Sequence, residues 1–289
     1  GNSGAEANEC AIKAARKYAA DKYGPERHKI VTLINSFHGR TIATLTATGQ
    51  EEMHRDFNPL LPGFLYTPAN DCEALKALAA EHDDIAAIMF ELVQGEGGVM
   101  PLERAFVDCM AELAAEKDIL LVCDEVQTGN GRTGSLYAWQ QYGFTPDIMS
   151  TAKGLGGGLP IGACLFGEKT ENTLTPGTHG STFGGSPAVC AGALSILGRI
   201  DEALLAQVRA KSEYLFSAFE GKPGIEQVSG LGLMIGIRTA KPAAEVVAKC
   251  MEQGVLVLTA HGKVRLLPAL NIPMELVKKA AEVIIAACA

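Results

Sequence analysis

The sequence predicts an α/β fold in which a mainly parallel central sheet is flanked by helices and followed by a smaller α+β domain. Three observations predict it. Short apolar runs alternate with helical segments over the first two thirds of the chain, a pattern typical of parallel sheets with crossover helices. Many of the 32 glycines cluster in short loops between those runs. The pattern changes after about residue 187, where long helices and short strands follow.

The first region begins with a helix-start signal, because Ser3 is followed three residues later by Glu6, as in a capping box. We expect a helix over residues 5–23. Apolar runs at residues 30–34, 85–90 and 119–123 are short enough to be buried strands. Helical segments at 72–80 and 104–117 precede the second and third of these runs. Residues 163–166 are expected to add a strand after a glycine-rich loop.

The second region is expected to be a separate small domain. Helices are predicted over residues 188–200, 203–219, 243–253 and 274–287, and short strands over 233–237, 255–258 and 264–267. The expected division is therefore a large domain at 1–199 and a small C-terminal domain at 200–289, joined by the helix near 188–200.

The composition excludes several classes of protein. A formal net charge of −8 and the lack of a basic stripe argue against a nucleic-acid partner. The apolar runs are too short to span a bilayer, and no signal peptide opens the chain. None of the eight cysteines is spaced as C-x-x-C. Buried free thiols in a reducing cytoplasm are therefore expected, in preference to a metal site or a disulfide framework.

Two residues carry the chemistry. Asp124 ends a buried apolar run, at the strand edge where parallel sheets bind ligands, although a lone acid there is more often a surface cap. Lys153 lies in a loop of glycines and apolar residues, where we expect its amine to be poorly solvated and nucleophilic. No nucleotide-binding motif matches this loop in register. A lysine that forms a Schiff base and an acid for a pyridinium nitrogen are what pyridoxal 5'-phosphate (PLP) requires.

The phosphate of such a cofactor needs hydrogen-bond donors. Gly4 and Ala5 open the first helix, where free N–H groups and the helix dipole favour an anion. Ser181 and Thr182 offer hydroxyls on a glycine-flanked loop. Each feature alone is more often an ordinary cap or turn, but together with Lys153 they fit one ligand.

The order of motifs resembles the class-III aminotransferases, which have the fold-type-I architecture. The resemblance spans essentially the whole chain and is closest to the branch that acts on N-acetylornithine. It is carried by the following segments: SGAEANE from Ser3, FHGRT from Phe37, QGEGG from Gln94, DEVQTG from Asp124, the Lys153 loop, HGSTFGG from His179 and VRLLP from Val264.

The resemblance implies a role for each cofactor-binding residue. Asp124 is expected to pair with the pyridine nitrogen and Gln127 with the phenolic oxygen, while Val126 and Phe37 cover the two faces of the ring. The phosphate is expected to contact Gly4 and Ala5 of one subunit and Thr182 of its neighbour. A homodimer with shared active sites is therefore implied.

The resemblance also implies the substrates. Arg40 and Arg265 are the expected carboxylate clamps, since a planar guanidinium matches a carboxylate, and Glu96 is expected to mask Arg265 while the amino donor is bound. The reaction would transfer the terminal amine of N-acetylornithine, or of a similar acylated diamino acid, to 2-oxoglutarate, as in arginine biosynthesis. Aminotransferases for ornithine, succinyldiaminopimelate or 4-aminobutyrate remain alternatives. Glutamate-1-semialdehyde aminomutase is disfavoured, because internal amine transfer needs no carboxylate switch.

The beginning of the chain suggests a missing segment. No initiator Met precedes Gly1, and the sequence runs at once into the first helix. We expect roughly a hundred residues of the family's N-terminal segment to be absent. An inactive fragment is therefore the non-enzymatic alternative.

Overall fold

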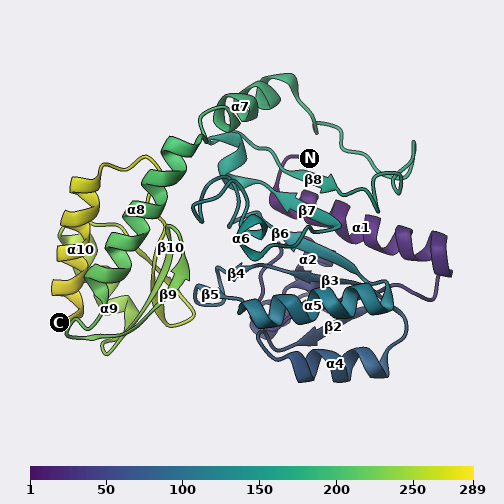
Figure 1. The fold of residues 1–289 in the computed structure, drawn as a ribbon, viewed down its shortest axis with the longest axis horizontal. Helices are drawn as coiled ribbons and strands as arrows, with labels where there is room; N and C mark the ends of the chain where they lie inside the picture. The colour runs from purple at the N-terminus through teal and green to yellow at the C-terminus, as the bar shows by residue number, and fades with distance from the viewer. The chain divides into compact units, whose positions relative to one another are not determined.

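The structure is a computed structural model that describes residues 1–289, and the chain divides into two compact units. The first unit comprises Gly1–Leu92, Leu102–Gly129 and Ala138–Gly198. Its six-stranded sheet has the order β2-β1-β3-β6-β7-β8, drawn in Figure 1. The strands are β1 (Lys29–Leu33), β2 (Phe64–Thr67), β3 (Ile85–Phe90), β6 (Leu120–Asp124), β7 (Ile148–Thr151) and β8 (Ala163–Phe166). Only β8 is antiparallel to its neighbour, so the predicted mainly parallel sheet is confirmed.

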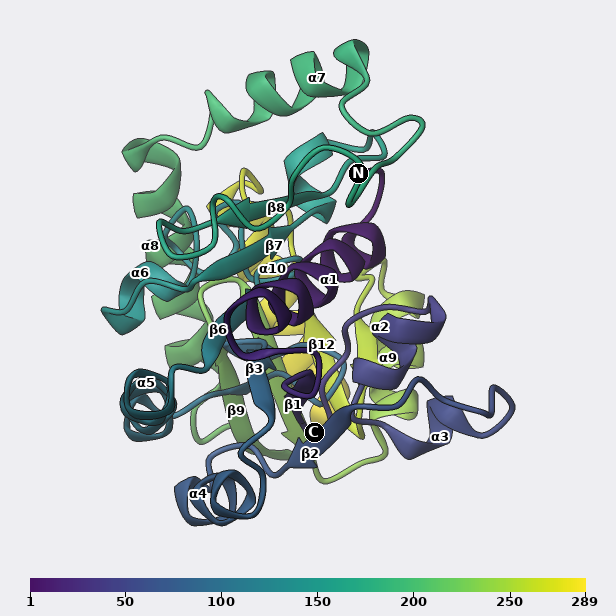
Figure 2. The same ribbon diagram turned by 90° about the vertical axis from the view of Figure 1, so that its right-hand side faces the viewer.

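Helices cover both faces of this sheet, which explains why its central strands are continuous apolar runs. On one face, Ala87 and Met89 of β3 pack with α1 (Gly4–Tyr23) and α2 (Ile42–Ala47). On the other face, Ile88 and Phe90 pack with α4 (Cys72–Glu81) and α5 (Arg104–Lys117). Figure 2 shows α1 and the α4–α5 pair on opposite sides of the strands. The unit is completed by α3 (Glu51–His54), α6 (Trp139–Tyr142), the 3₁₀ helix η1 (Lys153–Gly156) and α7 (Pro187–Leu197).

The second unit comprises Val93–Pro101, Asn130–Tyr137 and Arg199–Ala289. Its antiparallel sheet has the order β11-β12-β10-β9. The elements are a hairpin of β4 (Val93–Gln94) and β5 (Met100–Pro101), helices α8 (Glu202–Phe219), α9 (Ala243–Glu252) and α10 (Met274–Cys288), and strands β9 (Ile225–Leu231), β10 (Met234–Thr239), β11 (Leu258–Ala260) and β12 (Lys263–Leu266). Apolar side chains of α8, α9 and α10 form its core with β10 and β12.

The division differs from the expected single boundary, because two earlier segments belong to the second unit. Residues 93–101 form the β4–β5 hairpin, and the Ser229 hydroxyl of β9 donates a hydrogen bond to the Val99 carbonyl of that hairpin at 2.8 Å. Residues 130–137 are held by Arg132, which donates to the carbonyls of Leu233 and Pro268 at 3.0 and 2.6 Å. Such contacts join residues more than a hundred positions apart, which local patterns do not reveal.

Other differences concern the cysteines and the weaker strands. The expectation that all eight cysteines are free is wrong for two of them, because Cys72 of α4 and Cys109 of α5 form a disulfide across the helix pair, with Cα atoms 6.2 Å apart. The expected strand at 255–258 lies later, at β11, and β2, β7 and β9 were not predicted. No helix combines the length and apolar character that crossing a membrane would require.

Candidate active site

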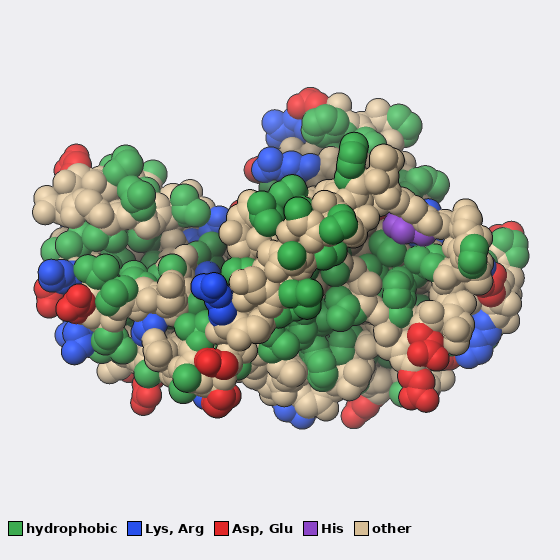
Figure 3. Space-filling model, turned by 90° about the horizontal axis from the view of Figure 1, so that it is seen from above, with side chains coloured by type: hydrophobic (Ala, Val, Ile, Leu, Met, Phe, Trp, Pro, Cys, Tyr) green, Lys and Arg blue, Asp and Glu red, His purple; other side chains and the backbone are tan.

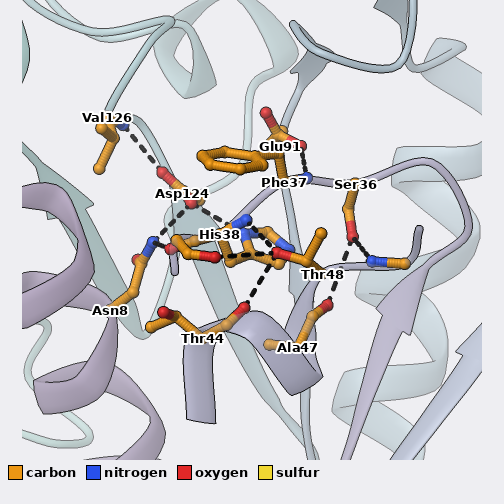
Figure 4. Close-up of polar contacts among 12 residues, drawn as sticks. Asn8, Ser36, Phe37, His38, Thr44, Ala47, Thr48, Glu91, Asp124 and Val126 are labelled. Carbon is orange, nitrogen blue, oxygen red and sulfur yellow. Dashed lines mark hydrogen bonds and ion pairs between the residues drawn. The ribbon is translucent and has the colours of Figure 1, made fainter. Parts of the chain in front are cut away.

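A buried carboxylate with three hydrogen-bond donors forms the centre of the candidate site in the first unit. Asp124 ends β6 with its side chain 3% exposed. Its Oδ2 accepts from the Asn8 side-chain amide and lies against Nδ1 of His38, both at 2.8 Å, and its Oδ1 accepts from the Val126 backbone N–H at 2.9 Å. Figure 4 shows these contacts converging on Asp124 from α1, the loop after β1 and the turn after β6.

The surroundings of Asp124 favour its charged form. Burial alone raises the pKa of the Asp124 carboxyl, but the hydrogen bond and charge of His38, together with the Val126 and Asn8 donors, hold that pKa below its usual value. Asn8 also donates to the His38 carbonyl at 2.7 Å, so the donors are themselves fixed. Asp124 is therefore a preorganised buried anion at the carboxyl end of a parallel strand, where ligands bind in such sheets.

A second buried acid, Glu91, lies beside this network. It directly follows β3, and its Oε2 accepts a hydrogen bond from the Phe37 backbone N–H at 2.9 Å. Burial raises the pKa of Glu91 to about 7, and the Asp124 charge adds to the rise while His38, the Phe37 hydrogen bond and Lys153 oppose it. Figure 4 draws the Phe37 ring in the same cluster as Glu91 and Asp124. Glu91 thus anchors the backbone of the residue expected to stack on the cofactor.

The start of α1 closes against the turn after β6. Ser3 caps the helix by accepting from the Glu6 backbone N–H at 3.1 Å. A Cβ on Gly4 would lie 2.7 Å from Cγ1 of Val126, so only glycine allows this approach. Ala5 lies against the loop after β1, where a Cβ on Gly39 would come within 3.0 Å of the Ala5 Cβ. The free N–H groups of this helix end are thereby brought close to Val126.

The predicted hydroxyl residues lie at the same end of α1. Asn2 donates a side-chain hydrogen bond to the Ser181 Oγ at 3.2 Å. Ser181 and Thr182 line, with the residues that precede α1, an open cavity of about 900 Å³. Both hydroxyl residues are exposed, so they are accessible to an anion.

Lys153 begins η1, one residue after the end of β7, with a positive φ of 42° that non-glycine residues seldom adopt. Its side chain is exposed in the single chain, so the expected poor solvation is wrong. The neighbouring glycines leave the lysine uncovered because they contribute no side chains. Placement at a strand end, rather than desolvation, is what the chain itself provides.

Two further predicted residues, Arg40 and Gln127, belong to the first unit. The Arg40 guanidinium lies 5.9 Å from the centre of the Phe37 ring, and the Arg40 side chain is otherwise exposed. The Gln127 side chain has a buried amide oxygen without a hydrogen-bond partner. A buried polar atom of this kind is costly unless a ligand or water satisfies it.

The second unit brings together the other two predicted substrate residues. Arg265 on β12 donates to Oε1 of Glu96 at 2.7 Å, and their side chains are 9% and 33% exposed. Glu96 lies in the turn of the β4–β5 hairpin, so an acid and a strand arginine 169 residues apart form one ion pair.

Three residues of the site were not assigned a role from the sequence: Asn8, His38 and Glu91. Asn8 and His38 lie inside motifs that carried the resemblance, but polar residues next to a glycine or in a helix give no signal of their own. Glu91 did carry a signal, because an acid directly after the apolar run at 85–90 repeats the pattern of Asp124.

Comparison with known proteins gives the family. The model of the aminotransferase class-III family matches residues 1–288. The chain belongs to the class-III aminotransferases.

Among curated members of this family, the acetylornithine aminotransferase of Haemophilus ducreyi is 50% identical over 285 residues, which cover 98% of this chain and 72% of that protein. Two solved structures are similar over 99% of the chain. The N-acetylornithine aminotransferase of Stenotrophomonas maltophilia has a TM-score of 0.84 at 36% identity, with 73% of its length covered. An ornithine aminotransferase of Toxoplasma gondii, with PLP partially occupying its active site, has a TM-score of 0.92 at 34% identity, with 71% covered. The fold is thus that of a PLP-dependent aminotransferase.

Proposed function

We propose that the chain transfers the terminal amine of N-acetylornithine, or of a similar acylated diamino acid, to 2-oxoglutarate with bound PLP. The observation that carries this proposal is the ion pair between Glu96 and Arg265, because a masked arginine suits an enzyme that must accept a dicarboxylate in only one of two half-reactions. The acetylornithine aminotransferases among its relatives support the same substrate.

The residues of the first unit fit PLP. The Asp124 carboxylate, kept charged by its donors, suits a protonated pyridine nitrogen. The unsatisfied Gln127 amide suits the phenolic oxygen, since the side-chain amide can turn to present its N–H. Val126 and Phe37 supply two apolar surfaces for a flat ring. When bound, PLP provides an electron sink for the carbon that carries the reacting amine.

The phosphate is assigned to the helix start. Gly4 and Ala5 present backbone N–H groups and the positive end of the α1 dipole, without a side chain in the way at Gly4. Ser181 and Thr182 add exposed hydroxyls on the loop nearby, with Thr182 assigned to the phosphate of a neighbouring subunit. A dianion is therefore matched by donors rather than by further acids.

Lys153 is assigned two tasks. Its Nζ would hold the cofactor covalently, and when free it would remove the proton from the substrate carbon that carries the reacting amine. Asp124 and its donors stay fixed throughout. The task of the buried network is therefore to hold charge, and the task of Lys153 is to move a proton.

Arg40 and Arg265 are assigned to substrate carboxylates. Glu96 neutralises Arg265 while the amino donor, which brings only one carboxylate, is bound. It releases Arg265 when 2-oxoglutarate brings a second carboxylate. Replacing Glu96 is expected to favour the dicarboxylate over the amino donor. Kinetic constants that stay at their wild-type values for both half-reactions in a Glu96→Ala variant would contradict the switch.

A homodimer is part of the proposal. Four large apolar side chains of the first unit lie in the segment that runs from the end of η1 through α7 and are 41–76% exposed: Leu159, Leu165, Phe183 and Leu194. Of the eleven residues of α7, nearly all apolar, only Ala193 is buried. Figure 3 shows hydrophobic side chains gathered on the face seen from above, and apolar area of this kind marks interaction surfaces.

Ornithine is the second candidate donor, because the chain is similar to the structure of the Toxoplasma gondii ornithine aminotransferase, with a TM-score of 0.92. The deciding experiment supplies the chain with PLP and 2-oxoglutarate and measures glutamate formed from N-acetylornithine, succinylornithine, ornithine or 4-aminobutyrate. The proposal predicts the highest kcat/KM for N-acetylornithine and no turnover by Lys153→Ala. Preference for ornithine would establish the second candidate, and no glutamate from any donor would refute both.

A further inference from the structure

A buried lysine without an acidic partner stands next to the ion pair in the second unit. Lys263 on β12 is 4% exposed and forms no salt bridge. Its Nζ lies 2.8 Å from the Ser229 Oγ and 3.1 Å from the Met100 Sδ. Burial and the charge of Arg238 lower its pKa. A buried ammonium group is costly, so its presence calls for a reason that packing alone does not give.

The contacts of Lys263 lead to the hairpin that carries Glu96. Ser229 accepts the hydrogen bond from Lys263 and donates its own to the Val99 carbonyl at 2.8 Å. Lys263 reaches the next residue, Met100, directly. Lys263 and Ser229 thus hold two successive residues at the C-terminal side of the Glu96 turn.

The hairpin adopts a backbone that needs such support. Val99 is fully buried with a φ of 52°, a strained value for a β-branched residue, and it follows Gly98 at 96°. The turn presses on the sheet at Gly236 of β10, where a Cβ would lie 2.9 Å from the Val99 Cβ and 3.1 Å from the Gly98 carbonyl oxygen.

The sheet register joins these contacts to Arg265. Ser229, Gly236 and Arg265 are directly paired across β9, β10 and β12, so they share one face of the sheet. Lys263 precedes Arg265 by two residues and therefore lies on that face as well. Arg265, Lys263 and Gly236, against which the turn of the hairpin packs, therefore lie on the same face of the sheet.

We propose that Lys263 and Ser229 are positioning residues that hold the β4–β5 hairpin so that Glu96 masks Arg265. Loss of either contact lets the strained turn relax and moves Glu96 away from the guanidinium. This role rests on the proposed masking of Arg265. It adds two residues that determine how completely Glu96 shields the Arg265 guanidinium.

The test measures how accessible Arg265 is, without cofactor or turnover. Phenylglyoxal modifies free guanidinium groups, and peptide mass spectrometry gives its rate at each arginine. Lys263→Met and Ser229→Ala are expected to raise the rate at Arg265 about five-fold, the population change that one hydrogen bond of ordinary strength accounts for. Ser229→Thr keeps the hydroxyl and should restore the wild-type rate. Lys222→Met, which alters an exposed lysine of the same unit, is the matched control.

Two comparisons separate positioning from general loosening. A Lys263→Met/Glu96→Gln double variant should label Arg265 no faster than Glu96→Gln alone, because both changes remove the same mask. The half-buried Arg132 of the same unit donates to the carbonyls of Leu233 and Pro268 and should keep its wild-type rate of modification. Equal acceleration at Arg132, or an unchanged rate at Arg265 in both single variants, overturns the proposal.

Hydrogen exchange distinguishes failure here from failure of the proposed function. Amides of residues 93–101 should exchange faster in Lys263→Met and Ser229→Ala than in the wild type. If Glu96→Gln leaves the rate of Arg265 modification unchanged, the masking in the proposed function fails. Faster exchange of residues 93–101 in Lys263→Met and Ser229→Ala would still establish that Lys263 and Ser229 hold the hairpin. Unchanged exchange of residues 93–101 in both variants overturns the role of Lys263 and Ser229, whatever the result for Glu96→Gln.

Discussion

Replacing Asp124 with asparagine tests the buried network at the centre of the site. The side chain keeps its shape, but one of its two oxygens becomes an amide donor. In either orientation this new donor faces an existing one, namely the Asn8 and His38 donors at 2.8 Å or the Val126 N–H at 2.9 Å. A hydrogen bond to a charged acceptor contributes about 1.5–3 kcal/mol, and an unsatisfied buried donor costs about 1–3 kcal/mol. We therefore expect Asp124→Asn to lower the free energy of unfolding by about 2.5–6 kcal/mol.

Trp139, the single tryptophan, lies in the first unit, so its fluorescence during urea unfolding follows the unit that contains Asp124. Asp108→Asn is the control, because Asp108 is 51% exposed in an ion pair with Arg104 on the same helix and should cost less than about 0.5 kcal/mol. PLP affinity should fall in the Asp124 variant and not in the control. Equal stability losses in the two variants would refute the view of Asp124 as a preorganised anion.

Three other changes give direct measurements. The pKa of Glu91 is raised from its usual 4.5 to about 7 in the folded chain, so the folded state binds the proton more tightly than the unfolded state. The free energy of unfolding therefore falls by about 3 kcal/mol as the pH rises from about 4.5 through 7. Glu91→Gln should flatten that part of a urea-unfolding pH profile, and an unchanged slope would count against a buried neutral acid. Gly4→Ala should weaken PLP binding measured by titration and lower stability by about 1–3 kcal/mol, whereas Gly180→Ala, where a Cβ meets nothing within 4 Å, should do neither. Loss of the Cys72–Cys109 disulfide, which joins residues 37 positions apart, should lower the free energy of unfolding by about 3–4 kcal/mol, so reductant should destabilise the wild type and not a Cys72→Ala/Cys109→Ala variant.

The sequence predicted the parts of the fold whose signals are local. The helix over 104–117 and the strands at 85–90 and 163–166 have the predicted bounds. The strand at 85–90 is buried along its whole length, so its continuous apolar run marks it strongly. β9 was missed because its polar residues alternate irregularly along an edge of its sheet. The hairpin at 93–101 belongs to the second unit through contacts with residues far along the chain, which no window of sequence contains.

The candidate site shows the same limit. Asp124 was predicted because a buried strand ends in an acid, and Glu91 has the same signal. The sequence does not show that the Asn8 and His38 side chains meet Asp124, since this depends on how α1 and the loop after β1 pack. The solvation of Lys153 was predicted wrongly from its neighbours, because composition says nothing about what covers a side chain.

Covalent capture of the cofactor tests whether Lys153 is the residue that holds it. The chain is incubated with PLP, reduced with borohydride so that any bond between the cofactor aldehyde and a lysine becomes permanent, and digested for peptide mass spectrometry. We expect one dominant adduct on Lys153, which disappears in Lys153→Ala and weakens in Asp124→Asn. A dominant adduct on another lysine, or no specific adduct at saturating PLP, would contradict it.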